Sequence, residues 1–361
     1  MRILLLSHGP SVHTRRWAQA LRARGHDLRL LTAYPAPDLG VSVQVVGLPM
    51  RPQVLRYLSA VGAVRRQFAA FRPDATIAHF LPNYGFLAAA AGIRPFALAC
   101  WGSDLLLNAR RTPFHRARAR FVLRRAGLIH VDAAVLAAAA ISLGAPRQRV
   151  WTRAWGVEPW ALLPKRTPGD VPQQGAQPIR ILWTRQLERV YDPLTFARAL
   201  GILARRGVLF RATMAGEGPL RRAVETRLRA DGVAAMVTMT GFVDSHRLRE
   251  LYRDGDVYVS LSLSDSTSQS LLEAMGAGLL SVVTDIEGNR EWVTHRGNGY
   301  LVPPGDAEAA ACAIAEAGRD PDADVMRSRA QELVSSRGRF EDTVAQLEAK
   351  LQALAVSGGG R

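Results

Sequence analysis

Short apolar runs alternate with longer amphipathic segments along the first half of the chain. Amphipathic stretches predict helices at 54–71, 84–91 and 113–126. The apolar runs are continuous rather than alternating, as in strands buried on both faces of a parallel sheet. They predict strands at 2–7, 27–32, 41–48, 75–80, 96–102 and 127–133. The first half therefore predicts a parallel sheet covered by helices.

The same pattern starts again after a polar, proline-rich stretch at 162–178, which we interpret as a linker. Further strands are predicted at 179–184, 208–216, 236–241, 256–263 and 279–285, and helices at 193–206, 219–230, 244–253 and 268–277. The fold class is therefore α/β, with two tandem Rossmann-like domains, 1–170 and 171–361, facing each other across a cleft. We expect the last helix, about 340–356, to pack back on the first domain. Ligands of such sheets bind beyond the carboxyl ends of the strands.

Length and composition agree with a two-domain globular protein. The 361 residues are 48% hydrophobic and 22% charged, and the only cysteines are Cys100 and Cys312. This excludes a disulfide framework and a Cys-x-x-Cys metal site, and it favours a reducing compartment. The apolar run at Ile3–Leu6 is too short for a signal peptide, and no run reaches the roughly 18 residues of a spanning helix. We expect a cytoplasmic protein, either soluble or peripheral on the cytoplasmic membrane face.

The positive charge is concentrated in the first half. Residues 1–170 carry a net charge of +17, whereas residues 171–361 carry −1. Seven arginines, together with His115 and no acid, lie within 109–125. A solvated basic face is one interpretation; we prefer contact with an anionic membrane surface or a lipid phosphate. A nucleic-acid partner is not expected, because no aromatic stacking platform or helix-turn-helix pattern accompanies the charge.

Candidate chemistry appears where a strand of the second domain ends. Asp265 follows the strand at 256–263, a loop rich in hydroxyl groups comes next, and Glu273 lies on the following helix. Ser268 is a candidate N-cap, so the first turn of this helix offers N–H groups to an anion or a sugar. Carboxylates accept hydrogen bonds from vicinal sugar hydroxyls. The alternative is that Asp265 forms an Asx turn and Glu273 faces solvent.

Several segments, in order along the chain, resemble retaining family-4 glycosyltransferases, which have the GT-B fold. The segment "SDSTSQSLLEAMGAG" is similar to the acid-x7-acid motif of that family, with Asp265 and Glu273 as its acids. Resemblance extends to "SHGPSVHTRRW", "AHFLPNYGF", "CWGSD", "WGVE", "TRQLERVYD", "AGEGPLRR" and "NGYLVPPGD". The resemblance therefore covers most of the chain.

The resemblance implies roles for individual residues. Glu273 would hold the ribose of a nucleotide-sugar donor, with Asp265 and the backbone N–H groups of the loop on the donor sugar. Arg185 and Arg189 would be the cations beside the diphosphate, which itself takes the acceptor proton. Further donor-binding residues would be Ser266, Thr267, Ser268, Gln269, Gly241, Phe242, Gly216 and Gly9. Acceptor-side residues would be His13, His79, Trp101, Asp104, Asn83 and Tyr84.

Three positions depart from the family pattern. The first acid is Asp265 rather than glutamate, and Ser-Thr-Ser replaces a glycine-aromatic-glycine run. Tyr191 occupies the position of a phosphate-binding lysine, which leaves Arg185 and Arg189 as alternatives for that role. Trp101 replaces a histidine at the end of a middle strand.

No metal site is expected. Asp254 and Asp256 have a D-x-D spacing, but they fall at the start of a strand and so lie at the wrong edge of the sheet. The carboxylates at 320–324 lack the glycine of a calcium loop and are interpreted as a turn before a helix.

The sequence thus predicts a retaining, metal-independent glycosyltransferase. It would need no cofactor. Its donor substrate would be a nucleotide sugar, with UDP or GDP as the nucleotide. The acceptor would be a glycan, a lipid-linked molecule or a small molecule. A non-catalytic nucleotide-sugar-binding module and a GT-B sugar epimerase are the alternatives.

Overall fold

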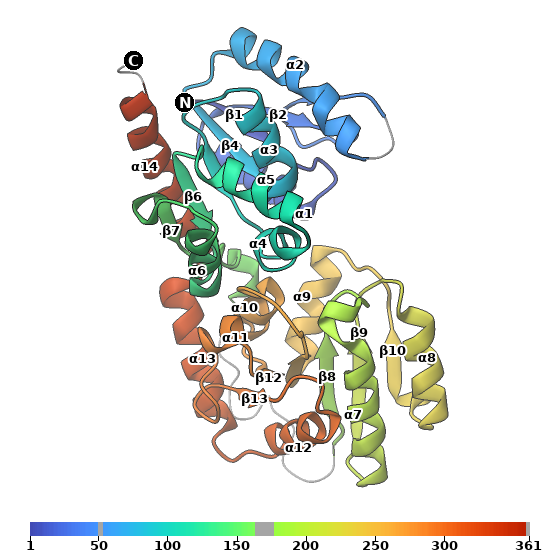
Figure 1. The fold of residues 1–361 in the computed structure, drawn as a ribbon. Coiled ribbons are helices and arrows are strands. Elements are labelled where there is room, and N and C mark those ends of the chain that lie inside the picture. Colours follow the sequence, from blue (N-terminus) through green and yellow to red (C-terminus); the bar gives the residue numbers. More distant parts are fainter. Residues whose placement is uncertain (50–52, 163–176, 359–361) are drawn as a thin grey trace. The chain divides into compact units, whose positions relative to one another are not determined.

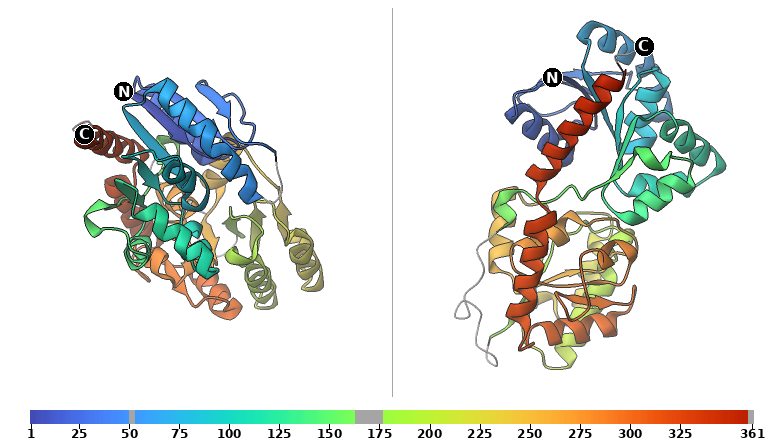
Figure 2. Two further views of the ribbon diagram at one scale, coloured as in Figure 1. Left: turned by 45° about the horizontal axis from the view of Figure 1, so that its top comes forward. Right: turned by 90° about the vertical axis from the view of Figure 1, so that its left-hand side faces the viewer.

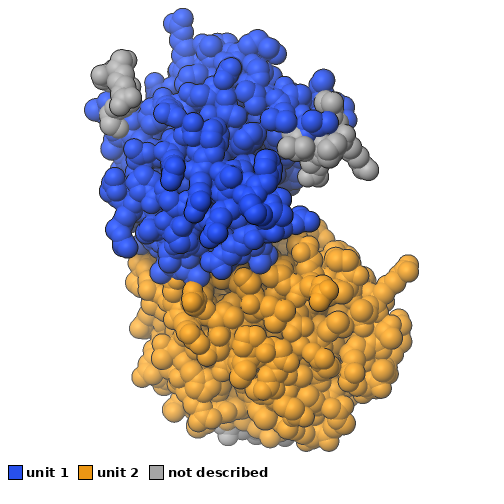
Figure 3. All heavy atoms as spheres, viewed as in Figure 1, with its two compact units in different colours: residues 1–154, 341–361 blue, residues 155–340 orange. Residues whose placement is uncertain are grey.

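The computed structural model describes residues 1–49, 53–162 and 177–358. The chain divides into two compact units (Figure 3). Unit 1 is Met1–Ala154 together with the segment from Glu341 onward, and unit 2 is Trp155–Phe340. The division falls after Ala154, earlier than the predicted boundary at residue 170. Most of the predicted linker, residues 163–176, lies outside the described residues.

Unit 1 is built on a seven-stranded parallel sheet with strand order β3-β2-β1-β4-β5-β6-β7 (Figure 1). The strands are β1 (Arg2–Leu6), β2 (Asp27–Thr32), β3 (Ser42–Val45), β4 (Ala75–His79), β5 (Ala97–Ala99), β6 (Leu128–Val131) and β7 (Val150–Thr152). The first six lie within predicted strands. The edge strand β7 was not predicted, because Arg149 and Arg153 flank it and leave no apolar run long enough to recognise.

Helices flank this sheet. They are α1 (Val12–Ala23), α2 (Gln53–Phe71), the π-helical η1 (Phe80–Gly85), α3 (Phe86–Ala90), α4 (Ser103–Leu106), η2 (Asn108–Arg110), α5 (Pro113–Leu123), α6 (Ala134–Ser142), η3 (Arg147–Arg149) and α14 (Phe340–Gly358). The C-terminal helix α14 runs alongside the rest of unit 1 (Figure 2). Its Thr343 hydroxyl donates to the carbonyl of Ala154 at 2.8 Å, and Leu351 is fully buried. Burial of Leu351 and its apolar neighbours attaches α14 to unit 1.

Unit 2 contains a six-stranded parallel sheet with strand order β10-β9-β8-β11-β12-β13. The strands are β8 (Ile179–Trp183), β9 (Phe210–Met214), β10 (Val237–Met239), β11 (Val257–Ser260), β12 (Leu280–Thr284) and β13 (Tyr300–Val302). Here too the unpredicted strand, β13, is a three-residue strand at the edge of the sheet. In the interior of the sheet, β11 and β12 are completely buried, which explains their mainly apolar sequences.

Unit 2 places its helices on either side of the sheet (Figure 1). They are η4 (Pro159–Ala161), η5 (Arg189–Tyr191), α7 (Pro193–Arg205), α8 (Arg221–Ala230), η6 (Ala234–Met236), α9 (Ser245–Asp254), α10 (Gln269–Gly276), α11 (Glu287–Arg290), α12 (Ala307–Ala317) and α13 (Ala323–Arg337). Trp183 of β8 stacks on Phe196 of α7, with ring centroids 5.0 Å apart, inside the core. Such aromatic packing fixes α7 against the sheet.

The strand order places a topological switch point in each sheet. In unit 2 the chain moves outward from β8 through β9 to β10, and then returns to β11 on the other side of β8. The loops after β8 and β11 therefore leave the sheet in opposite directions and open a crevice at its carboxyl edge, where ligands of such sheets bind. In unit 1 the corresponding point lies between β1 and β4.

Candidate active site

The two loops at the switch point of unit 2 are joined by an ion pair. Arg185, just after β8, donates from Nη2 to Oδ2 of Asp265, in the loop after β11, at 2.6 Å. Only 10% of the arginine side chain and 18% of the aspartate side chain are exposed. The partial burial strengthens the attraction relative to a surface pair and fixes both groups in one place.

Arg185 makes further contacts that hold its guanidinium flat against the loop. Its Nη1 donates to the hydroxyls of Ser268 at 2.8 Å and Ser270 at 3.1 Å. Its Cζ lies 4.1 Å from the centre of the Tyr191 ring, a cation–π distance. Tyr191, which replaces the expected lysine, therefore stacks on the remaining cation. Arg189 is exposed and takes part in no ion pair within the described parts of the chain.

Ser268 caps helix α10, as predicted. Its side chain accepts from the N–H of Leu271 at 3.3 Å, and the helix begins at Gln269. Helix α11 packs against the loop that precedes α10. A Cβ on Gly288 of α11 would lie 2.1 Å from the carbonyl oxygen of Ser266 in that loop. Only glycine fits there, so the backbone of the hydroxyl-rich loop rests directly on α11. Trp292 adds a contact from its Nε1 to the Thr267 hydroxyl at 3.4 Å.

Glu273 lies on the second turn of α10 and is half-buried. The hydroxyl of Tyr252, at the end of α9, donates to its Oε2 at 3.0 Å, and Gln269 donates to its Oε1 at 3.2 Å. Burial, together with the nearby charge of Glu273, raises the pKa of the Tyr252 hydroxyl well above its usual range. Tyr252 therefore stays a neutral donor that orients the carboxylate. Glu273 is thus only partly exposed, and two side chains hold its carboxylate in place.

The glycines predicted beside the donor have close backbone neighbours. A Cβ on Gly216, after β9, would lie 2.3 Å from the carbonyl oxygen of Arg185. Gly241, after β10, has a φ of 74°, which favours glycine, and the neighbouring Phe242 is 77% exposed. Both turns belong to the carboxyl edge of the unit 2 sheet. Gly9 belongs to unit 1, where the space for a Cβ is filled by Ala36 at 2.5 Å. Packing explains this last glycine.

Three of the predicted acceptor-side residues lie together in unit 1. The rings of His13 and Trp101 are 5.3 Å apart, and those of His79 and Trp101 are 5.9 Å apart. His79 is 1% exposed, and its Nδ1 is 3.0 Å from the hydroxyl of Ser7. Burial lowers the pKa of His79 to about 3, and the proximity of His13 and His130 adds to this. His79 is therefore a neutral core group at physiological pH.

Asp104, Tyr84 and Asn83 follow the strands next to this cluster. Asp104 is fully buried and accepts hydrogen bonds from the backbone N–H groups of Leu81 and Trp101 at about 3.1 Å, thereby tying the loop after β4 to the loop after β5. Tyr84 is 1% exposed, and its hydroxyl accepts from the N–H of Ala33 at 3.2 Å. Both residues thus position loops in the structure described here. Asn83, which directly precedes Tyr84, is half-buried.

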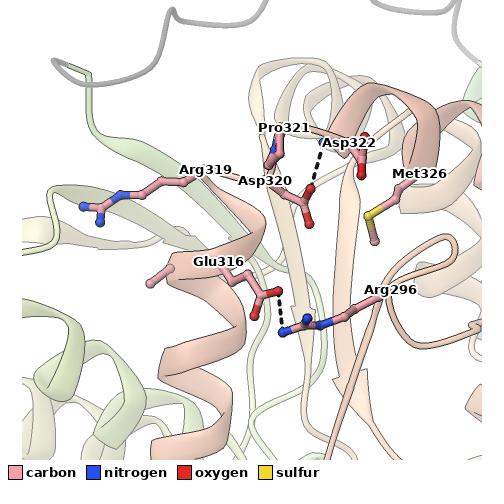
Figure 4. A pocket seen from close by; sticks show the side chains of 8 residues that line it. Arg296, Glu316, Arg319, Asp320, Pro321, Asp322 and Met326 are labelled. Atoms are coloured by element: carbon pink, nitrogen blue, oxygen red, sulfur yellow. Dashed lines mark hydrogen bonds and ion pairs between the residues drawn. The ribbon is translucent and has the colours of Figure 1, made fainter.

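Two of the carboxylates considered for metal binding, Asp256 and Asp320, have other partners. Asp256 accepts from Arg180 through Nε at 2.9 Å and Nη2 at 2.7 Å, at the start of β11. Asp320 lines a pocket with Glu316, Arg296 and Asp322 (Figure 4). There Glu316 pairs with Arg296 at 2.8 Å, and Asp320 accepts from the backbone N–H of Asp322 at 2.8 Å. No group of three metal-ligating side chains occurs among the described residues.

The pocket of Figure 4 also lies at the wrong edge of the sheet for a ligand of the switch point. A Cβ on Gly318, between its lining residues, would lie 2.3 Å from Ile179, the first residue of β8. The pocket is therefore at the amino edge of the strands, whereas Arg185 and Asp265 lie at the carboxyl edge. Its ion pair between Arg296 and Glu316 links the loop before β13 to α12.

Sequence comparison agrees with the geometry. Residues 8–152 match the family described as "Glycosyl transferase 4-like domain", and residues 178–320 match "Glycosyl transferases group 1". The chain belongs to the group 1, or family-4, glycosyltransferases, an enzyme family that transfers sugars with retention and has the GT-B fold.

Individual relatives share moderate identity with the chain. WcaL of Escherichia coli K12, a glycosyltransferase named for colanic acid biosynthesis, is 28% identical over 297 residues, which cover 79% of this chain and 71% of that protein. AmsK of Erwinia amylovora, named for amylovoran biosynthesis, is 27% identical over 180 residues, covering 48% of this chain and 43% of that protein.

Solved structures share the fold at lower identity. Anabaena Alr3699/HepE in complex with UDP superposes with a TM-score of 0.79 at 18% identity, covering 98% of this chain and 100% of that one. Sucrose-phosphate synthase from Thermosynechococcus elongatus gives a TM-score of 0.82 at 18% identity, covering 99% and 100%. Within the described residues, no helix is both long enough and apolar enough to cross a bilayer.

The sequence did not reveal the residues that support the acids. These residues are Tyr252 of α9, Tyr258 of β11 and Gly288 of α11. Only the tertiary structure brings each of them next to the loop or to α10. The hydroxyl of Tyr258, for example, lies 2.8 Å from the hydroxyl of Ser270. Nothing local in the sequence marks them. Only the position of Tyr252 at the end of a predicted helix, just before the strand that leads to Asp265, hints at proximity.

Proposed function

We propose that the carboxyl edge of the unit 2 sheet binds the nucleotide-sugar donor. Glu273 accepts hydrogen bonds from the two ribose hydroxyls, because its carboxylate is oriented by Tyr252 and Gln269. Arg185 and the N-terminal turn of α10 lie beside the diphosphate and stabilise the negative charge that develops on it. The observation that carries this proposal is that one short helix holds Glu273 and, through its cap Ser268, the guanidinium of Arg185.

In this proposal Asp265 is paired first with Arg185 and then with hydroxyls of the donor sugar. In the structure its carboxylate is paired with Arg185 and accepts from the N–H of Ser266 at 2.9 Å. The diphosphate would compete for Arg185, which frees Asp265 to accept from hydroxyls of the donor sugar. The N–H groups of Thr267, Ser268 and Gln269 face the same sugar. The leaving diphosphate would take the acceptor proton, so the reaction needs no metal and no protein nucleophile.

The preferred donor base is uracil, with guanine second. The Anabaena HepE structures contain UDP and UDP-glucose, and the shared fold favours a similar donor for this chain. Gly241 and Phe242, at the end of β10, would contact the base; the exposed ring of Phe242 is available for stacking. Gly216 allows the turn after β9 to approach the diphosphate.

The acceptor is assigned to unit 1. His13, Trp101 and Asn83 would contact it, while His79, Asp104 and Tyr84 hold their loops from beneath. A polysaccharide precursor is favoured because WcaL is named for colanic acid biosynthesis and AmsK for amylovoran biosynthesis. The basic surface of this unit would contact an anionic membrane or a lipid-linked acceptor.

Product analysis tests this proposal. The protein would be incubated with UDP-glucose, UDP-galactose or GDP-mannose, with EDTA present and with candidate acceptors added. We expect one donor to be consumed faster when an acceptor is present, and the anomeric configuration of the product to match that of the donor. Donor binding without any turnover would indicate a binding module instead. Conversion of the sugar without an acceptor would indicate an epimerase.

A further inference from the structure

An apolar groove opens on the surface of unit 1, among α2, η1, α3 and α5. Its volume is about 440 Å³. Seven of its lining residues are Tyr57, Leu58, Pro82, Phe86, Phe114, Ala117 and Phe121, and the eighth is Arg118. Helices α3 and α5, which form two of its walls, pack against each other (Figure 1). Residues from four separate elements thus build one concave hydrocarbon-lined surface.

Helix α5 carries three stripes of side chains, and one of them lines the groove. Ala119, Val122 and Leu123 are buried and face the core. A second stripe, with the helical spacing i, i+3, i+4, i+7, lines the groove; it consists of Phe114, Ala117, Arg118 and Phe121. A third stripe carries the exposed arginines Arg116, Arg120 and Arg124. Apolar and cationic stripes therefore run side by side along the same helix.

The groove keeps large apolar side chains in contact with water. Phe114 is 64% exposed and Leu58 is 49% exposed. Single exposed apolar residues are common on protein surfaces, but here they border one concavity, and such gathering marks an interaction site. Covering these side chains would release a favourable hydrophobic free energy.

The charge around the groove selects the kind of partner. No ion pair links an arginine of α5 to an acidic residue in the parts of the chain described here. The Nε of Arg118 is buried without a hydrogen-bond partner among the described residues, while its side chain lines the groove. Unneutralised cations beside a hydrocarbon groove complement a molecule with an aliphatic chain and an anionic head. A second copy of this chain would bring like charges together, which disfavours self-association.

We propose that this face of unit 1 docks on an anionic lipid bilayer, with one lipid chain in the groove and lipid phosphates against the arginine stripe of α5. This builds on the membrane contact in the proposed function, but it does not depend on sugar transfer. Charge alone would give a loosely held layer at the membrane surface. The groove adds a hydrophobic contribution that salt does not screen.

Vesicle partitioning tests the proposal with variants that separate the two contributions. Vesicles of phosphatidylcholine alone would be compared with vesicles containing about 30% phosphatidylglycerol, at about 0.1 M and about 0.5 M salt. Phe114→Ser removes an exposed groove side chain, and Ala117→Trp fills the groove while keeping every charge. Arg116→Gln with Arg120→Gln removes charge without touching the groove. Leu209→Ser, which removes a 60%-exposed apolar side chain from unit 2, is the matched control.

We expect the wild type to partition onto anionic vesicles more strongly than onto neutral ones. The double arginine variant should bind about 30-fold more weakly at low salt, since each cation near the surface contributes about 1 kcal/mol. Phe114→Ser and Ala117→Trp should each bind about tenfold more weakly at both salt concentrations. Leu209→Ser should bind as the wild type does.

Three outcomes would overturn the proposal. The first is equal binding of the wild type to neutral and anionic vesicles. The second is unchanged binding of both groove variants, which would leave a purely electrostatic contact. The third is a lipid-free dimer that Phe114→Ser dissociates, which would make the groove a self-association site. Melting temperatures confirm that each variant is folded. Nucleotide binding, measured in parallel, reports on the transferase proposal separately, because Phe114 and Ala117 lie in the other unit from the donor residues.

Discussion

Arg185 and Asp265 are 80 residues apart in the sequence and form a nearly buried ion pair of 2.6 Å at the carboxyl edge of the unit 2 sheet. The pair joins a cation proposed for the diphosphate to an acid proposed for the donor sugar. Each group therefore holds the other in place before the donor arrives. In the proposed function, donor binding would rearrange both groups and so couple recognition of the diphosphate to recognition of the sugar.

Replacing Arg185 by glutamine should destabilise unit 2 and abolish transfer. The substitution leaves the carboxylate of Asp265 without its cation and two serine hydroxyls without a donor. We expect a loss of about 2–4 kcal/mol in the free energy of unfolding, measured by urea denaturation. Adding Asp265→Asn should recover part of that loss. If the two single losses are simply additive, the pair is not coupled and the account of this ion pair is wrong.

Tyr252→Phe should weaken donor binding while leaving the fold intact. The substitution removes the hydroxyl that donates to Glu273 at 3.0 Å. We expect KM for the donor to rise about tenfold with a smaller change in kcat, because one hydrogen bond to a charged group is lost. The control is Tyr300→Phe, which removes a tyrosine hydroxyl that bonds Asp320 at the other edge of the same sheet. Equal KM values for the two variants would contradict the role assigned to Tyr252.

Gly288→Ala should displace the loop after β11, which is proposed to bind the donor. The added Cβ would meet the carbonyl oxygens of Ser266 and Asp265 at 2.1 and 2.8 Å, so the loop backbone must move. Donor binding should weaken at least tenfold, and stability should fall by about 1–3 kcal/mol. Gly62→Ala is the control, since its nearest neighbour is the end of the Arg66 side chain at 3.7 Å. Wild-type nucleotide affinity in Gly288→Ala would show that the loop does not contact the donor.

Acid should destabilise unit 1 through its buried histidines. Burial lowers the pKa of His79 to about 3 and that of His130 to about 4. The unfolded chain takes up these protons near pH 6.5, but the folded chain does not, so stability is complete above that pH and falls below it. Each histidine contributes a slope of about 1.4 kcal/mol per pH unit between pH 6.5 and its folded pKa.

Protonation of Asp104 has the opposite effect on the stability of the folded chain over part of this pH range. Burial raises its pKa to about 6, so the folded state binds its proton first and gains stability as pH falls from 6 to about 4. Urea denaturation between pH 4.5 and 7.5 should therefore show a net fall in stability toward acid. His79→Gln should reduce the slope of the free energy of unfolding against pH by the contribution of one proton, about 1.4 kcal/mol per pH unit. An unchanged slope in that variant would mean that His79 is protonated in the folded chain.

Most of the fold and the two acids of the site could be predicted from the sequence. Continuous apolar runs marked the buried strands, and the acid-x7-acid spacing placed Asp265 before α10 and Glu273 on it. The edge strands β7 and β13 were missed because no longer apolar run surrounds their three residues, whereas the equally short β5 and β10 lie within longer apolar runs. The partner of Asp265 could not be predicted, because Arg185 reaches it only when β8 and β11 lie side by side.

Other residues were placed by packing that no local pattern records. Gly9 beside the diphosphate stays a prediction; the structure adds that Ala36 occupies the position of its Cβ. The family resemblance made Tyr84 and His79 candidates for acceptor contact, and both are buried. Their hydroxyl and ring nitrogen are satisfied by Ala33 and Ser7 from neighbouring segments of unit 1. Such partners are set by tertiary structure.

Calorimetric titration of UDP and GDP, with EDTA present, into the wild type and Glu273→Gln tests the donor site most directly. Glu291→Gln, a change of the same kind outside α10, is the control. We predict that one nucleotide binds the wild type and the control equally, and that Glu273→Gln binds it at least tenfold more weakly without a matching loss of stability. Equal affinity in Glu273→Gln, or binding that disappears with EDTA, would contradict the account.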